Sequence, residues 1–191
     1  MEGNKTNINW FPGHMVKAKK EIKDNLSLVD VVIEIVDARI PKSSRNPDFD
    51  DLIINKPRVV GLNKFDLADD RVNREWIEFY KKKGIPAVLI NSVDGTGIRD
   101  ILFKAKDLVK DKIEKSSERG RIGRSVKVAV IGIPNAGKSS FINKVAKRNA
   151  ANVGNKPGVT RTKQWIRTDI GAPITQKECI FKTTSWLHGE K

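Results

Sequence analysis

The sequence is poor in several residue types, and each shortage excludes a class of protein. A single cysteine, Cys179, rules out an internal disulfide and indicates a reducing compartment. No apolar run approaches the about 20 residues that a transmembrane helix needs, so we expect no membrane contact through a span. Residues 1–10 lack the apolar centre of a signal peptide and include Glu2. We therefore expect a soluble, cytoplasmic protein.

Acidic residues are also scarce relative to basic ones. The 191 residues include 37 Lys and Arg but only 23 Asp and Glu, which gives a net charge of +14. Such an excess suggests a polyanionic partner, either nucleic acid or an anionic membrane surface, and the alternative is a solvated lysine-rich surface. The apolar content of 38% is that of a globular chain, and the length suits one domain with a short extension.

Short apolar segments alternate with amphipathic ones along the chain. This alternation predicts an α/β domain of the P-loop NTPase type, with a mainly parallel sheet flanked by helices. The expected strands are Leu28–Val36, Arg58–Leu62, Pro86–Ile90, Val126–Ile131 and Gln164–Ile170. The expected helices are His14–Leu26, Pro47–Ile54, Ala68–Lys83, Gly97–Lys115 and Ser139–Arg148, with a linker at Ser116–Ser125 and a mobile loop at Asn149–Arg161.

A phosphate-binding motif follows the fourth predicted strand. Residues Gly132–Ser139 fit the pattern G-x-x-x-x-G-K-[ST] and open a helix, which is the context that the motif requires. Glycines let the backbone wrap closely around phosphate. The exposed N–H groups and the helix N-terminus stabilise the negative charge of that phosphate. Lys138 would neutralise the β- and γ-phosphates, and the Ser139 hydroxyl would bind Mg²⁺. The alternative is a tight strand–helix turn without a ligand.

A second motif, Asn63-Lys64-Phe65-Asp66, follows the second predicted strand and fits N-K-x-D, the guanine-binding loop of P-loop GTPases. A carboxylate at Asp66 can accept hydrogen bonds from guanine N1–H and the 2-amino group together, a pair of donors that adenine lacks. Asn91 and Ser92 follow the next strand and would support the base, although Val93 and Asp94 depart from the usual S-A-K sequence. Plain polar turns are the alternative at both places.

The order of these motifs resembles the order found in one family, the YlqF-related circularly permuted GTPases. In ordinary GTPases the phosphate loop precedes N-K-x-D, whereas here it follows. The same sheet can form if the original termini are joined, and Lys106–Ser125 would be the join. The resemblance covers about residues 8–171 and is carried by Asn9–Met15, Asp37–Pro41 with Ser44–Pro47, Asn63–Asp66, Gly132–Ser140 and the switch-like segment Pro157–Thr160.

The resemblance implies a site for GTP or GDP with Mg²⁺ and K⁺. The GTP-binding residues that it implies are Asn63, Lys64, Asp66, Asn91, Ser92, Asn135, Ala136, Gly137, Lys138, Ser139, Ser140 and Thr160. Ser139 and Thr160 would bind Mg²⁺, and Asn135 would bind K⁺. His14 would orient the attacking water in place of a glutamine, and packing beside Trp10 and Phe11 is the alternative for this histidine.

The same resemblance implies a monomeric assembly factor of the large ribosomal subunit, in which GTP hydrolysis switches between rRNA binding and release. Arg39 and Arg45 would contact RNA phosphate or form structural salt bridges. Two other functions remain open. One is a guanine-nucleotide or RNA-binding module that does not hydrolyse GTP, and the other is a P-loop ATPase or kinase, which Asn63–Asp66 disfavours.

The sequence departs from the family after Gly171. No D-x-x-G, whose Asp and Gly serve Mg²⁺ and the γ-phosphate, follows Thr160. We therefore expect a G domain over residues 1–171, an unassigned tail over 172–191 and impaired hydrolysis, from a frameshift or a truncated paralogue. We also expect an absent central strand, which would leave Gln164–Ile170 without a neighbour and Val126–Ile131 at an exposed edge, with Ile174–Phe181 as a poor substitute.

Overall fold

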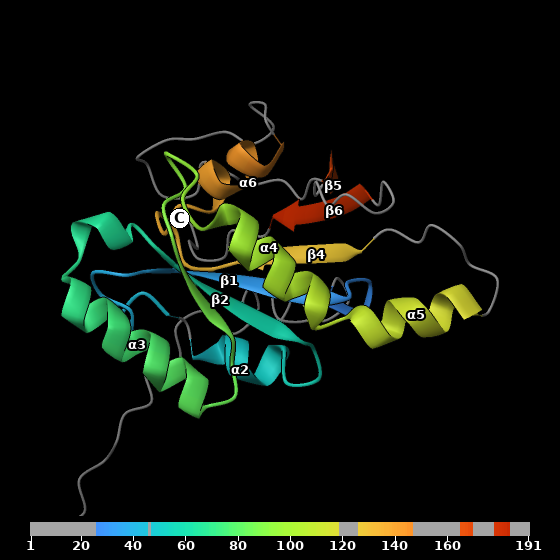
Figure 1. Ribbon diagram of the computed structural model, residues 1–191, viewed down its shortest axis with the longest axis horizontal. Helices are drawn as coiled ribbons and strands as arrows, with labels where there is room; N and C mark the ends of the chain where they lie inside the picture. The colour runs from blue at the N-terminus through green and yellow to red at the C-terminus, as the bar shows by residue number, and fades with distance from the viewer. Residues whose placement is uncertain (1–25, 46, 119–125, 147–164, 170–177, 184–191) are drawn as a thin grey trace, which may run out of the picture.

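A computed structural model describes residues 26–45, 47–118, 126–146, 165–169 and 178–183 (Figure 1). Its strands are β1 (Val31–Asp37), β2 (Arg58–Asn63), β3 (Ala87–Ile90), β4 (Lys127–Ile131), β5 (Trp165–Asp169) and β6 (Glu178–Thr183). Its helices are α2 (Asp48–Leu52), the short 3₁₀ helix η1 (Phe65–Leu67), α3 (Asp70–Lys82), α4 (Ile98–Asp107), α5 (Lys110–Glu118) and α6 (Lys138–Ala146). All five predicted strands are confirmed.

The strands form a single sheet in the order β3-β2-β1-β4-β6-β5. Four neighbouring pairs are parallel, and only β5 and β6 are antiparallel. The predicted α/β fold with a mainly parallel sheet and flanking helices is therefore confirmed. Parallel strands end at the same edge of a sheet, so the loops after β1, β2, β3 and β4 meet there.

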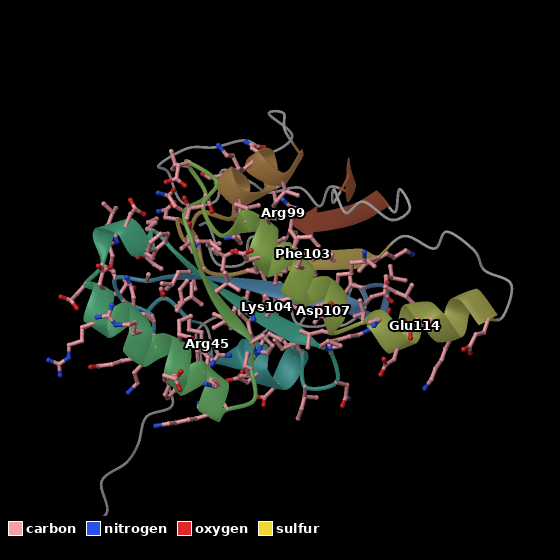
Figure 2. The ribbon with its side chains drawn as sticks, in the orientation of Figure 1. Arg45, Arg99, Phe103, Lys104, Asp107 and Glu114 are labelled. Carbon is pink, nitrogen blue, oxygen red and sulfur yellow. The ribbon has the colours of Figure 1, made fainter. Side chains whose placement is uncertain are left out.

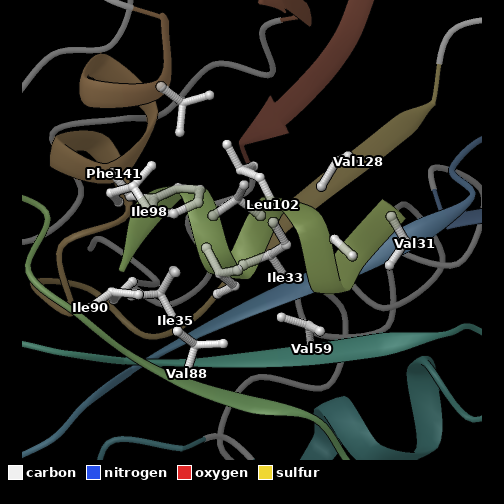
Figure 3. Packing of buried hydrophobic residues seen from close by; sticks show 14 of the residues in the cluster. Val31, Ile33, Ile35, Val59, Val88, Ile90, Ile98, Leu102, Val128 and Phe141 are labelled. Atoms are coloured by element: carbon white, nitrogen blue, oxygen red, sulfur yellow. The ribbon is translucent and has the colours of Figure 1, made fainter. Parts of the chain in front are cut away.

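The two faces of the sheet have different helical covers. On one face, α4 and α6 pack on Ile33, Ile35 and Val130 within the largest apolar cluster (Figure 3). On the other face, α2 packs near Val32 and α3 places Tyr80 against the sheet. Because both faces of β1 are covered, all seven of its residues are buried. This burial explains why β1 is an almost continuous apolar run rather than an alternating one.

The expected gap in the sheet is not there, so that prediction was wrong. β6 lies between β4 and β5, with Lys127 opposite Ile180 in the parallel pair and Trp165 opposite Lys182 in the antiparallel pair. β4 is therefore not an edge strand, and β5 has a neighbour. The weak substitute segment, predicted at Ile174–Phe181, is a strand displaced toward the C-terminus. Any chain segment can supply the backbone hydrogen bonds that an open strand edge leaves unmet.

The helix predicted over Gly97–Lys115 is two helices, α4 and α5, which run in different directions (Figure 1). The N–H group of Val109 donates to the carbonyl of Lys106, three residues back, at 3.1 Å. This bond tightens the turn while the Val109 side chain stays in the core. Helix α3 also begins later than expected because the Asp69 side chain caps it, accepting from the N–H groups of Arg71 and Val72.

None of the described helices is long and apolar enough to cross a membrane. Of the helix predicted at His14–Leu26, only Leu26 is among the described residues. The loop predicted at Asn149–Arg161 lies entirely outside them.

Candidate functional site

The phosphate-loop motif occupies the turn between β4 and α6. Gly132 and Gly137 both have positive φ, 149° and 99°. A Cβ atom on Gly132 would lie 2.4 Å from the carbonyl oxygen of Ile35, and one on Gly137 would lie 2.1 Å from Asn63 Nδ2. Both positions therefore require glycine for steric as well as conformational reasons. The loop is pressed against the ends of β1 and β2, which fixes its path.

The Asn63 side chain joins three of the loops at this edge. Its Nδ2 donates to the carbonyl of Ala136 in the phosphate loop at 2.8 Å. Its Oδ1 accepts from the backbone N–H of Ser92 at 3.0 Å and from the Ser92 hydroxyl at 2.9 Å. Only 2% of the Asn63 surface is exposed, so these bonds are made away from water. One amide thus connects the predicted guanine loop with the base-support loop and the phosphate loop.

Lys64 makes a second connection beside the first. Its Nζ donates to the carbonyl of Asn135 at 2.9 Å and to Asp37 Oδ2 at 2.9 Å. Asn63 and Lys64 therefore bind successive carbonyls of the phosphate loop. Both Lys64 and Asn135 have left-handed backbones, with φ of 61° and 62°. Such conformations are uncommon outside glycine, and the surrounding hydrogen bonds stabilise them here.

Asp37, the last residue of β1, is the acidic centre of this edge. Its carboxylate accepts from the N–H and Nε of Arg39 and from Lys64 Nζ. Burial alone would raise the pKa of Asp37, but the hydrogen bonds from Arg39 and Lys64 outweigh it and hold the pKa well below its usual range. Asp37 is therefore ionised throughout the neutral range. From the sequence, this residue was predicted only as part of a family motif, and its link to Lys64 was not predicted.

Lys138 points into its own loop. Its Nζ donates to the carbonyl of Ile133 at 2.8 Å, and only 7% of the residue is exposed. Burial lowers the pKa of Lys138 to about 8. An anion placed in the loop would favour the charged form and counter that effect. Ser139 and Ser140 follow in the first turn of α6, both half-buried.

The remaining predicted residues divide into two groups. Asp66 lies exposed in η1, and Asn91 shapes its own turn, with Oδ1 accepting from the N–H groups of Val93 (2.8 Å) and Asp94 (3.3 Å). His14 and Thr160 lie outside the described residues. The structure thus brings together Asn63, Lys64, Asp66, Asn91, Ser92, Asn135, Ala136, Gly137, Lys138, Ser139 and Ser140 around one edge of the sheet.

Both arginines of the loop after β1 form ion pairs. Arg39 pairs with Asp37, and Arg45 pairs with the buried Glu34 at 2.8 Å and with Asp50. Figure 2 shows Arg45 near α2 and α3, whereas Arg99, Phe103 and Lys104 lie along the outer face of α4. The alternatives for these arginines were contacts with RNA phosphate and structural salt bridges, and the structure contains the salt bridges. Arg39 nevertheless remains 46% exposed.

A sheet of this order, with a glycine-rich loop between a central parallel strand and a helix, defines a P-loop nucleotide-binding fold. A family model described as 50S ribosome-binding GTPase matches residues 127–181. The chain is 51% identical over 160 residues to ribosome biogenesis GTPase A of Bacillus cereus, covering 84% of this chain and 54% of that protein. It is 40% identical over 160 residues to mitochondrial ribosome-associated GTPase 1 of Mus musculus, covering 80% and 48%.

Solved structures give the same assignment. The crystal structure of GNP-bound YlqF from T. maritima aligns with a TM-score of 0.57 at 26% identity, covering 90% of this chain and 60% of that one. The chain belongs to the YlqF-related circularly permuted GTPases. It spans about half the length of the curated relatives it matches.

Proposed function

We propose that the chain binds GTP and GDP at the carboxyl edge of its sheet and serves in assembly of the large ribosomal subunit. The observation that carries the nucleotide site is the Asn63 side chain, which connects the guanine, base-support and phosphate loops. Such a connection holds base-binding and phosphate-binding groups at a fixed spacing, as one nucleotide spanning both requires. Two relatives are named ribosome biogenesis GTPase A and mitochondrial ribosome-associated GTPase 1, and these names support the ribosomal role.

Each side chain has a distinct part in this proposal. Asp66 accepts from guanine N1–H and the 2-amino group, and the Lys64 stem covers one face of the base. Ser92 and Asn91 shape the loop beneath the base. Lys138 and the N–H groups of residues 135–140, among them those of Ala136, Gly137 and Ser140, neutralise the phosphates. The domain predicted for this binding was residues 1–171, with 172–191 as an unassigned tail. Because β6 (Glu178–Thr183) pairs with β4 and β5, we propose that the binding domain includes β6.

The site suits a magnesium ion that is carried by the nucleotide. In the described part of the chain, no group of three His, Cys, Asp or Glu side chains could hold a metal by itself. The Ser139 hydroxyl is a hard oxygen donor at the start of α6, and Mg²⁺ takes such donors together with phosphate oxygens and water. Thr160 would add a second ligand, and Asn135 would bind K⁺. When bound, these cations neutralise charge that develops on the phosphates.

Hydrolysis is the second part of the proposal, with His14 orienting the water. We propose that this chain hydrolyses GTP slowly, because D-x-x-G should follow the strand beside the phosphate-loop strand. β6 lies in that place, and the residues after it are Thr184-Ser185-Trp186-Leu187. The same observation favours a second candidate function, a guanine-nucleotide and RNA-binding module without turnover. In either case, the net charge of +14 provides affinity for rRNA, and the chain acts as a cytoplasmic monomer.

Nucleotide competition tests the binding site. A fluorescent GDP analogue bound to the chain should be displaced by GTP and by GDP. ATP at about 100 times the GDP concentration should not displace it. Asp66→Ala should weaken binding about 100-fold, because one charged acceptor of two hydrogen bonds is lost. Glu75→Ala, which removes an exposed carboxylate on α3, is the matched control. Equal displacement by ATP would refute the guanine site.

Single-turnover hydrolysis separates the two candidate functions. The chain is kept in excess over GTP, and hydrolysis is measured with and without purified large ribosomal subunits. A slow rate that the subunits accelerate supports the assembly GTPase. Guanine-nucleotide binding with no hydrolysis under either condition supports the module without turnover.

A further inference from the structure

We propose that Asp37 is a positioning residue of the guanine-nucleotide site, acting through Lys64. The proposal rests on the proposed function, because Lys64 is the residue taken to cover the base. Asp37 itself need not touch the nucleotide. Its carboxylate would hold the lysine in the place where the base arrives.

The geometry around Lys64 supports this role. Lys64 Nζ is shared between Asp37 Oδ2 and the carbonyl of Asn135, each at 2.9 Å. The Lys64 backbone is left-handed, at φ 61°, in a loop where a lysine has no intrinsic preference for that conformation. A free lysine side chain also loses much rotamer entropy when it becomes ordered. Because Asp37 orders the Lys64 side chain before any nucleotide binds, most of this entropy is lost beforehand, and nucleotide binding is favoured.

Arg39 holds the carboxylate in turn. Its Nε donates to Asp37 Oδ1 at 2.9 Å, and its Nη2 donates to Oδ2 at 2.8 Å. A guanidinium that binds both oxygens fixes the plane of the carboxylate as well as its position. Asp37 is also buried, with 5% of its surface exposed, so few other orientations are open to it. Oδ2 is thereby aimed at Lys64.

The backbone of Asp37 has a separate anchor, which provides a matched control. The N–H of Asp37 donates to Ser44 Oγ at 3.0 Å, and the Ser44 hydroxyl donates to the Asp37 carbonyl at 3.3 Å. Ser44 therefore fixes the loop after β1 without touching the carboxylate. A loss that comes from loop structure alone should appear in a Ser44 variant. A loss that comes through Lys64 should not.

A double-mutant cycle tests the proposal with the full chain and a fluorescent GDP analogue. Asp37→Asn should weaken binding about tenfold, the size of one charge-assisted hydrogen bond, and Ser44→Ala less than about threefold. Lys64→Met should weaken binding by itself, and adding Asp37→Asn to it should cause no further loss. Additive losses would overturn the role of Asp37, and so would equal losses from Asp37→Asn and Ser44→Ala.

The outcomes also separate this proposal from the one on which it rests. A wild-type chain that binds no guanine nucleotide overturns both. A wild-type chain that binds tightly, with additive losses in the cycle, overturns the role of Asp37 alone. Circular dichroism checks that each variant is folded. If Asp37→Asn does not fold, Asp37→Glu replaces it, because glutamate keeps the charge but moves it by one methylene, and the same absence of further loss in Lys64→Met is expected.

Discussion

Two buried asparagines have very different surroundings. Asn63 makes three side-chain hydrogen bonds, whereas Asn73, which is 1% exposed, donates from Nδ2 to the carbonyl of Phe65, and its Oδ1 has no hydrogen-bond partner within the described structure. We predict that Asn63→Ala lowers the free energy of unfolding by about 2–3 kcal/mol, because it leaves buried groups of Ala136 and Ser92 unpaired. Asn73→Ala should cost clearly less. Equal costs in urea denaturation would contradict the linking role of Asn63.

The buried amine of Lys138 should make stability depend on pH in an unusual direction. Its pKa of about 8 in the folded chain lies below the value of about 10.4 expected after unfolding. Between these values the unfolded chain holds more protons, so the free energy of unfolding rises with pH. Without nucleotide, wild type should gain on the order of 1–3 kcal/mol relative to Lys138→Met from pH 8 to pH 10. A constant difference in denaturant titrations at these pH values would contradict the prediction.

Single residues differ in how far the sequence could predict them. Motif spacing was sufficient for Lys138, Asn63 and Ser92, which the structure brings to one edge of the sheet. The link between Asp37 and Lys64 was not predicted, because 27 residues separate the two and no spacing rule connects them. Contacts of that kind depend on which strands become neighbours, which is a property of the sheet.

At the scale of elements, the contact between β2 and α4 depends on one small residue. A Cβ atom on Gly61 would lie 2.8 Å from the terminal methyl groups of Ile90 and Ile101. Gly61→Val should therefore lower the free energy of unfolding by about 2–3 kcal/mol through overpacking. Gly84→Ala is the control. Gly84 has φ of +68° with open space around it, so its cost should be about 1 kcal/mol. Chemical denaturation of both variants measures the difference.

The loop after β1 is fixed to the sheet by a buried ion cluster. Glu34, which is 1% exposed, pairs with Arg45 at 2.8 Å and with Arg58 at 3.3 Å. Burial raises the pKa of Glu34, although Arg45 and Arg58 offset part of the effect. Arg45→Met should cost about 3 kcal/mol, because Glu34 keeps only its more distant partner. Adding Glu34→Gln should restore part of the loss, and thermal unfolding of the two variants would show it.

Whole elements were predicted well where the local pattern was strong. The buried runs that form β1, β2 and β4 needed only their β-branched residues. The helix ends moved by a few residues because caps such as Asp69 set them. β6 was underestimated, because its sequence pattern is poor and its place depends on the open edges of β4 and β5.

At the scale of the molecule, the excess of basic residues should make ribosome binding depend on salt. We predict that affinity for large ribosomal subunits falls about 100-fold between about 50 mM and about 200 mM salt, as when about five phosphates are neutralised. Co-sedimentation across a salt series measures the slope. Binding that hardly changes over this range would show that the net charge of +14 is only a solvated surface.

The permuted order of the strands also has a consequence in time. β1, β2 and β3, with the guanine and base-support loops, leave the ribosome during synthesis before β4 and the phosphate loop. The carbonyl that Asn63 binds lies 73 residues further along the chain. A nascent chain can therefore form three paired strands early, through contacts that are close in sequence. It gains a place for phosphate only after β4 and the phosphate loop have followed, so nucleotide capture reports that synthesis has passed the start of α6.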